Sequence, residues 1–399
     1  MKTKLIYSTL FLALVALSIF AWWFWPGKKP LSMFRQVQFN QLPGWKTANL
    51  KKSLQTFQTS CRAFVKQNPE QAVGTEHIDL HVKDWQPACH AALKIHHVSE
   101  KKARLFFHEW FLPVEYSDKK TAGPGLFTGY YVPTIKGSYT QSKEFSVPVY
   151  ETPSDLVTSD LGMFFPDLKN RILIGRLSGK KLVPYYTREQ ISKGAIEDKA
   201  RVLVWINSPI DRLFLGIQGS GMIELEDGTQ LSIGYDAQNG APYTAIAGVL
   251  IKKGVMTKHN ASMQAIKRYL EEHPEQMDKI LNENKSFVFF RKMSEGVALG
   301  SQGVALTPGY SLAIDRQWIP MGAPLWLNTT RPDSNKPDKS KPLQRLMIAQ
   351  DTGGAIRGKI RGDVFWGCGE RATLVAGHMK NEGHYWLLLP KHTVSRLEP

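Results

Sequence analysis

The chain has 399 residues, of which 42% are hydrophobic and 22% are charged. This composition excludes a wholly disordered chain and is sufficient for two or three globular domains. Lysine and arginine number 51 against 35 aspartates and glutamates, and the resulting charge of +16 favours anionic partners. Three cysteines are too few for a small disulfide scaffold, and the P-loop and common zinc-binding patterns are absent from the sequence. We expect no metal and no cofactor.

The N-terminal residues form an apolar segment. Lys2 and Lys4 precede an uncharged run of 21 residues from Leu5 to Trp25. A membrane-spanning helix needs roughly 20 apolar residues. The apolar part of a signal peptide is shorter, roughly 7–15 residues, and ends in small residues. Residues 1–30 are therefore expected to form an uncleaved membrane anchor, with a cleaved signal as the alternative, and the remaining chain is expected to be exported.

Residues 31–45 are predicted to be a tether that leads into the fold. Cys61 and Cys89 follow in the first folded segment, 28 positions apart. In an oxidising compartment they could form a disulfide, and two buried thiols are the other interpretation. Cys368 has no third partner left and is expected to be a small packed residue.

The pattern of apolar residues predicts helices, then strands, then helices, then strands. Helices are expected at 50–66, 90–112, 262–270 and after Pro274. Short β-branched or aromatic runs between Gly, Pro, Asp-Gly and Asn-Gly predict strands at 126–131, 144–150, 203–206, 222–233, 312–314, 324–327, 346–350, 363–366 and 385–389. Residues 331–345 are expected to be a mobile surface loop. One arrangement that fits this order inserts the middle β segment into a domain made by both flanks.

The densest group of candidate catalytic residues lies in region 350–367. Asp351 follows a strand-like segment, and Gly353 and Gly354 then permit a turn or a close approach to a ligand. Asp363 follows twelve positions later at the start of an aromatic strand. Two carboxylates on adjacent strand ends would make a catalytic edge, and ordinary turn chemistry is the structural alternative. The triplet Asp-Thr-Gly is also that of aspartic proteases, but these enzymes need two such carboxylates and the chain has one copy.

Four motifs give the chain a specific resemblance. Region 350–367 resembles the "three-aspartate" domain of the membrane-bound lytic murein transglycosylase A family, and 311–324 resembles the first aspartate motif of that domain. Upstream, residues 125–131 and 218–221 are similar to motifs in other blocks of the family. The four motifs occur in the expected order.

The resemblance implies an enzyme that cleaves the β-1,4 bond between N-acetylmuramic acid and N-acetylglucosamine in peptidoglycan. Such an enzyme leaves a 1,6-anhydromuramic end instead of adding water, and exo action is expected. By motif position, Asp363 corresponds to the acid that later acts as the base, and Asp351 and Asp315 match the other two aspartates. An ordinary aspartate has a pKa near 3.9, so the site must raise the pKa of Asp363. A glycan-binding or scaffolding protein without activity and a hydrolytic glycosidase are the alternatives.

The resemblance also implies a mainly β fold with flanking helices. A double-psi β-barrel domain would be built from both chain ends, 46–137 and 265–399, with its aspartate motifs in 300–390. A second, barrel-like β domain would be inserted at 138–264, with a groove between the two.

Sugar binding requires flat aromatic faces and polar partners, although core packing is the alternative for each aromatic residue. The residues expected to line the groove are Gly129, Tyr130, Tyr131, Gln218, Gly219, Ser220, Tyr243, Gln350, Gly353, Gly354 and Trp366.

Location and partners follow from the same features. Many members of the family carry a lipid on a cysteine just after the signal, but the first cysteine here is Cys61. We therefore expect a protein in the periplasm of a Gram-negative bacterium, held at the inner rather than the outer membrane by its N-terminal segment. Glycan strands and cell-wall synthesis proteins are the expected partners. Nucleic acid is not expected, because no nucleic-acid-binding motif accompanies the positive charge.

Overall fold

The computed structural model describes residues 33–116, 123–168, 171–257, 260–293, 298–336 and 339–394. The expected membrane anchor at 1–30 lies outside these residues. Within the described ranges, no helix is both long enough and apolar enough to cross a bilayer.

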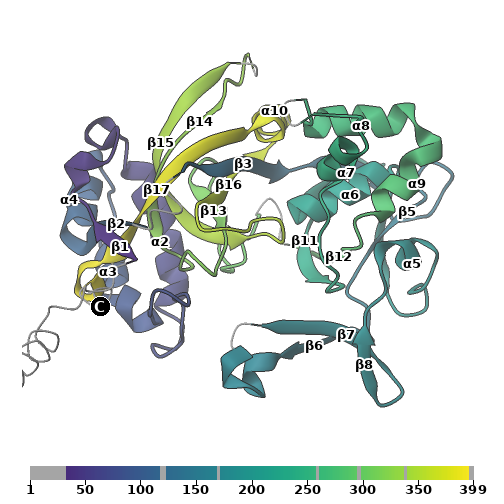
Figure 1. Cartoon of the computed structure of the whole chain (residues 1–399), viewed down its shortest axis with the longest axis horizontal. Helices are drawn as coiled ribbons and strands as arrows, with labels where there is room; N and C mark the ends of the chain where they lie inside the picture. The colour runs from purple at the N-terminus through teal and green to yellow at the C-terminus, as the bar shows by residue number, and fades with distance from the viewer. Residues whose placement is uncertain are drawn as a thin grey trace, which may run out of the picture.

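The largest sheet closes into a barrel made from both ends of the chain (Figure 1). Its strand order is β1-β2-β17-β14-β15-β13-β16-β3, and β17 also pairs with β3, so the strands from β17 to β3 form a six-stranded ring. The strands are β1 (Phe34–Gln36), β2 (Phe111–Tyr116), β3 (Gly125–Val132), β13 (Ser311–Ile314), β14 (Pro324–Pro332), β15 (Ser340–Thr352), β16 (Arg361–Cys368) and β17 (Lys380–Pro390). The expected mainly β fold with a barrel from both chain ends is confirmed.

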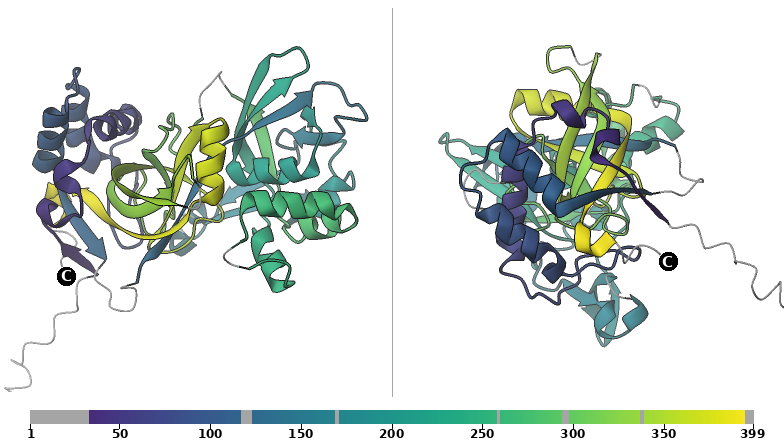
Figure 2. Two further views of the ribbon diagram at one scale, coloured as in Figure 1. Left: turned by 90° about the horizontal axis from the view of Figure 1, so that it is seen from above. Right: turned by 90° about the vertical axis from the view of Figure 1, so that its left-hand side faces the viewer.

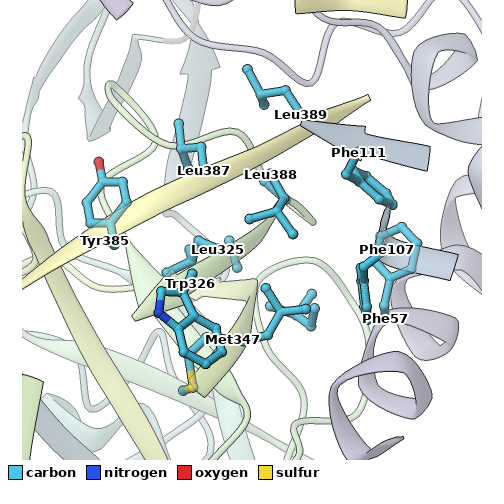
Figure 3. Close-up of a cluster of buried hydrophobic side chains, with 14 of the residues drawn as sticks. Phe57, Phe107, Phe111, Leu325, Trp326, Met347, Tyr385, Leu387, Leu388 and Leu389 are labelled. Atoms are coloured by element: carbon cyan, nitrogen blue, oxygen red, sulfur yellow. The ribbon is translucent and has the colours of Figure 1, made fainter. Parts of the chain in front are cut away.

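Helices from the N-terminal part cover one end of this barrel and share its hydrophobic core. They are α2 (Lys51–Phe64), α3 (Val82–Leu93) and α4 (Glu100–Trp110). Figure 3 shows Phe57 and Phe107 of these helices beside Phe111 and the leucines of β17. Cys61 and Cys89 are joined in a disulfide that links α2 to α3. Each large side chain that is fully buried in such a core contributes about 1.5–3 kcal/mol to folding.

A second sheet, in the order β12-β11-β10-β4-β9-β5, forms the inserted unit. Its strands are β4 (Thr134–Ser138), β5 (Val147–Tyr150), β9 (Val202–Ile206), β10 (Ser220–Leu225), β11 (Gln230–Gln238) and β12 (Val288–Lys292). Its helices are α5 (Arg188–Ser192), α6 (Pro209–Gln218), α7 (Ile246–Lys252), α8 (Met263–Glu272) and α9 (Pro274–Asn282). The strands β4 and β12 place the limits of this unit outside the expected range of 138–264, because the chain leaves the barrel directly after β3.

A third, three-stranded sheet projects from the inserted unit (Figures 1 and 2). Its strands are β6 (Val157–Asp160), β7 (Ile172–Ser178) and β8 (Lys181–Pro184), paired in the order β6-β7-β8. Two 3₁₀ turns, η4 (Leu161–Met163) and η5 (Pro166–Leu168), lie between β6 and β7. The remaining elements are η1 (Phe39–Gln41), η2 (Trp45–Thr47), α10 (Glu370–His378) and α11 (Lys391–Val394).

Several local expectations differ from the structure. The segment 31–45 is not a tether from Phe34 onward, because Phe39, Leu42 and Trp45 are buried in the main core. The expected helix at 90–112 is divided, since the Ser99 side chain caps the start of α4 by accepting from the Lys102 amide.

Two expectations near the C-terminal strands also change. Most of the expected loop at 331–345 belongs to the long β14–β15 hairpin, which extends to Pro332 and resumes at Ser340. Cys368 is exposed and free rather than packed.

Candidate active site at the junction of the two sheets

Two of the three predicted aspartates lie in one row across neighbouring barrel strands. Ala313 of β13 pairs with Asp351 of β15 on one side and with Asp363 of β16 on the other. Asp363 in turn pairs with Thr128 of β3. Neighbouring strands lie about 4.8 Å apart and paired residues share a face, so the two aspartates point the same way from backbones about 10 Å apart. The small Ala313 side chain between them is buried in a cluster with Tyr130 and Phe365.

Asp363 is half-buried and held by β3. Its Oδ1 accepts a hydrogen bond of 2.7 Å from Thr128 Oγ1, and Thr128 Oγ1 accepts one of 2.8 Å from the Arg361 guanidinium. Burial raises the pKa of Asp363 above its ordinary value, and the negative charge of Asp351 acts in the same direction. The Arg361 charge and the Thr128 hydrogen bond oppose these effects without cancelling them. A carboxyl with a raised pKa in an accessible site can act as a proton donor.

Asp351 has a different environment, because protein donors occupy its oxygens. Tyr130 donates to Oδ2 at 2.7 Å, and the amides of Ser301 and Thr352 donate to Oδ1 at 2.9 and 2.8 Å. Burial raises the pKa of Asp351, while these hydrogen bonds favour its ionised form. Tyr130 is buried, and its own pKa is raised well above the usual value by burial and by the charges of Asp351 and Asp363.

Asp315 lies away from this row and is 1% exposed. Its Oδ2 accepts from the Gly358 amide at 2.8 Å and its Oδ1 from the Gln317 amide at 3.2 Å. Arg357 lies 3.8 Å from Oδ1. These contacts tie the loop before β16 to the end of β13, so Asp315 is placed to hold the loop rather than to face a ligand.

A pocket of about 180 Å³ lies between the barrel and the inserted unit. Of the residues predicted for the groove, Gly129, Tyr131, Gln218 and Tyr243 line it. The Gln218 side chain of α6 accepts from the Tyr131 amide of β3 at 3.0 Å, so the two parts are also bonded at this point.

Tyr243, which lines the pocket, is also influenced by the charge of Asp363. Burial raises the pKa of Tyr243, the nearby Arg188 charge lowers it and the Asp363 charge raises it. Tyr243 belongs to the loop between β11 and α7, so the inserted unit contributes an aromatic ring within electrostatic reach of Asp363. The candidate site is therefore built by strands of one part and a loop of the other.

Two of the predicted groove residues occupy other positions. Gln350 is fully buried, and its side chain accepts from Ser311 and donates to Ser60, which ties β15 to α2. It cannot line a groove, and this prediction is wrong. Trp366 points to the face of β16 opposite Asp363 and packs closely against Gly129.

The other predicted residues shape turns. Gly219 ends α6 with a φ of +74°, and Ser220 begins β10. Gly353 accepts from the Ile356 amide in a turn, and Gly354 is exposed with open space around it. Within the described ranges, no group of three or more His, Cys, Asp or Glu residues is arranged to hold a metal ion.

The sequence reasoning missed Thr128 and Ser301. Thr128 stands two positions before Tyr130 in the same strand, so the alternation of a β-strand places both on one face. Ser301 bonds to Asp351 from a distant loop, through its backbone amide and its side chain, and no local pattern in the sequence indicates this contact.

Two family models match the chain. Residues 126–291 match "MltA specific insert domain" and residues 310–389 match "3D domain". The chain is 35% identical over 264 residues to "Membrane-bound lytic murein transglycosylase A" of Escherichia coli. That alignment covers 66% of this chain and 65% of the relative, slightly less than two thirds of its length.

Solved structures share the fold over almost the whole chain. A membrane-bound lytic murein transglycosylase from Agrobacterium tumefaciens has a TM-score of 0.81 at 28% identity and covers 91% of this chain and 99% of its own. MltA from Neisseria gonorrhoeae has a TM-score of 0.72 at 32% identity, covering 90% of this chain and 92% of its own. Escherichia coli MltA with bound chitohexaose has a TM-score of 0.64 at 26% identity, covering 91% and 96%. The chain belongs to the membrane-bound lytic murein transglycosylase A (MltA) family.

Proposed function

We propose that this protein is a lytic transglycosylase that cleaves the β-1,4 bond between N-acetylmuramic acid and N-acetylglucosamine in peptidoglycan. The observation that carries the proposal is Asp363, a half-buried carboxyl with a raised pKa whose charge also acts on Tyr243, a residue of the pocket where barrel and insert meet. Membership of the MltA family supports this assignment, as does the glycan chitohexaose bound to the Escherichia coli relative.

Asp363 acts first as an acid and then as a base. The protonated carboxyl donates its proton to the glycosidic oxygen, and the bond from that oxygen to C1 of the muramic residue breaks. The C6 hydroxyl of the same sugar then attacks C1, and the ionised Asp363 accepts the hydroxyl proton. The product is a 1,6-anhydro ring, and Asp363 ends protonated as it began. An internal hydroxyl needs no positioned water, so proximity replaces water activation.

The contacts of Asp351 favour this route over hydrolysis. A glycosidase needs a second carboxylate that is free to attack C1 or to activate water. The oxygens of Asp351 are instead engaged by Tyr130, Ser301 and Thr352. Asp351 is therefore suited to raise the pKa of Asp363 by its charge and to stabilise positive charge on the sugar ring.

We also propose roles for the other predicted residues, a location and partners. Tyr131, Gln218 and Tyr243 are the groove residues best placed to contact sugar, while Asp315 keeps the loop before β16 in position. We place the protein in the periplasm, attached to the inner membrane by its N-terminal apolar segment, with cell-wall synthesis proteins as partners. We also propose that the enzyme cleaves glycan strands from their ends (exo action).

Digestion of purified murein followed by mass analysis of the released muropeptides tests the function. Anhydro ends are expected, whereas reducing ends would identify a hydrolase and binding without release would identify a scaffold. Asp363→Asn should reduce release by at least about 10²-fold and keep binding, because general acid–base catalysis contributes roughly 10²–10⁴-fold. Substantial release by this variant would exclude Asp363 from the role.

Asp363→Asn should also fold normally. A raised pKa in the folded state means that the neutral carboxyl is favoured there, and stability is lost as the pH rises through that pKa. The neutral amide has the same shape, so the unfolding temperature at neutral pH should not fall. The matched variant Asp315→Asn should lower it, because Asp315 is buried in contacts with its loop.

A further inference from the structure

The three-stranded sheet β6-β7-β8 and its connecting turn, which we call the β6–β8 module, expose an unusual number of large apolar side chains. Their exposed fractions range from 39% at Leu182 to 83% at Met163. The exposed apolar residues of the module are Met163, Phe164, Phe165, Ile172, Leu173, Leu177 and Leu182. Elsewhere in the described chain, exposed residues of this size are isolated along the sequence. Soluble proteins rarely gather apolar surface in this way unless it contacts something.

One face of the module contacts the inserted unit. On β7, Ile174 packs against Gly240, where an added Cβ would lie 2.8 Å from the Ile174 Cβ. The Arg176 guanidinium lies 4.3 Å from the ring centre of Tyr186. Leu173 and Leu177 alternate with these residues and therefore occupy the opposite face. Leu173 and Leu177 are therefore not an unfinished part of the protein's own core, because the opposite face of β7 is the one that is docked.

The most exposed residues form a projecting tip rather than the wall of a groove. Met163, Phe164 and Phe165 lie in the turn between β6 and β7, at the end of the module that Figure 1 shows standing away from the barrel and the helices. A protein ligand requires a complementary surface of considerable area. A convex tip with two phenylalanines instead suits insertion into a soft apolar layer.

Basic residues accompany the apolar ones. Residues 157–184 contain five Lys or Arg and two Asp, a net charge of +3. Arg171 is exposed beside Ile172, and Lys180 and Lys181 are exposed beside Leu182. Apolar side chains with adjacent cations are characteristic of protein surfaces that bind the interface of anionic bilayers.

We propose that the β6–β8 module is a second membrane contact, separate from the N-terminal segment. Phe164, Phe165 and Met163 enter the interfacial layer of an anionic bilayer, and Arg171, Lys180 and Lys181 meet its headgroups. The docked face of the module reaches Gly240, three positions before Tyr243 in the same loop. Contact with the bilayer would therefore fix the orientation of the pocket relative to the membrane.

The test uses the full chain with Cys368→Ser, so that a single new cysteine can carry an environment-sensitive fluorophore. The fluorophore is placed at Phe164→Cys or, as a matched control, at Leu105→Cys, a residue of α4 that is 59% exposed. Protein is reconstituted into vesicles with one third phosphatidylglycerol, with and without brominated lipid. At position 164, we expect a blue-shifted emission and quenching by brominated lipid at least threefold stronger than at position 105.

Charge variants test whether the basic residues of the module contribute to membrane binding. Lys180→Glu with Lys181→Glu should lower the affinity of the module for the bilayer at least tenfold. Each basic residue near an anionic surface increases the membrane affinity by roughly a factor of five. The control pair Lys252→Glu with Lys253→Glu, exposed at the end of α7, should leave it unchanged. The unsubstituted module should show the same loss of affinity for vesicles without anionic lipid.

Equal quenching at positions 164 and 105 would overturn the proposal. So would a blue shift that brominated lipid does not quench and that grows with protein concentration, because it would show that the tip contacts another protein copy. None of these readouts depends on the catalytic activity, so this proposal and the proposed function can fail separately.

Discussion

Gly129 illustrates how a glycine predicted to bind sugar can instead be required for packing. An ideal Cβ added at Gly129 would lie 2.7 Å from Trp366 Nε1, 2.8 Å from Trp366 Cδ1 and 2.9 Å from the Ala376 Cα. Ordinary contacts of a Cβ lie at 3.4–4 Å. Gly129→Ala therefore requires the Trp366 ring and the backbone of α10 to move by about 0.5–1 Å.

An extra methyl group in a well-packed region destabilises a protein by about 1–3 kcal/mol. A change of 1 kcal/mol shifts the unfolding temperature of a large domain by roughly 2 °C. Gly129→Ala should therefore lower the unfolding temperature by about 2–6 °C. Because Gly129 lines the pocket, murein release should also fall.

Gly354 is the matched control, because an added Cβ would meet no atom within 4 Å. Gly354→Ala should leave the unfolding temperature unchanged or slightly higher. Differential scanning calorimetry and murein-release kinetics measure both variants. Equal unfolding temperatures for Gly129→Ala and the parent protein would refute the packing argument.

Three further predictions concern charge, covalent linkage and buried polar groups. Arg361→Gln removes a positive charge that lowers the pKa of Asp363, so this pKa should rise. The alkaline fall in murein release should then move to higher pH. A move to lower pH would contradict the role of Asp363 as the acid. Cys61→Ser with Cys89→Ser should reduce the free energy of unfolding by about 2–4 kcal/mol in urea titrations, and no change would show that the bond is dispensable. Arg212→Met should cost about 1–3 kcal/mol in the same titrations, because it leaves two backbone carbonyl acceptors unpaired.

Most elements of the fold could be predicted from local patterns. The alternation and turn residues of 125–132 and 220–238 are short-range signals, and the strands β3, β10 and β11 lie there. The closure of the barrel depends on the pairing of β17 with β3, which no local pattern encodes. That part of the prediction rested on family resemblance.

In the candidate site, too, local sequence patterns predict some residues correctly, whereas others depend on pairing between distant strands. Asp351 and Asp363 were predicted from their place at strand ends, and the structure brings them into one row. Gln350 was misplaced because the pairing of β13 with β15 shifts register between Leu312 and Ala313. A shift of one residue reverses the face of a strand, so Gln350 points into the core and Asp351 outward.

The pairing of β3 with β16 has a consequence for biosynthesis. Arg361 and Leu126, which are hydrogen-bonded partners in the ring, are 235 positions apart in the chain. A ribosome or an export channel delivers β3 long before β16 and β17, so β3 must wait unpaired while the whole insert emerges. Contacts of such high sequence separation slow folding, and an exposed strand edge invites aggregation during the delay. A nascent chain that stops before β16 cannot close the barrel, so the residues from β16 onward govern whether the barrel forms at all.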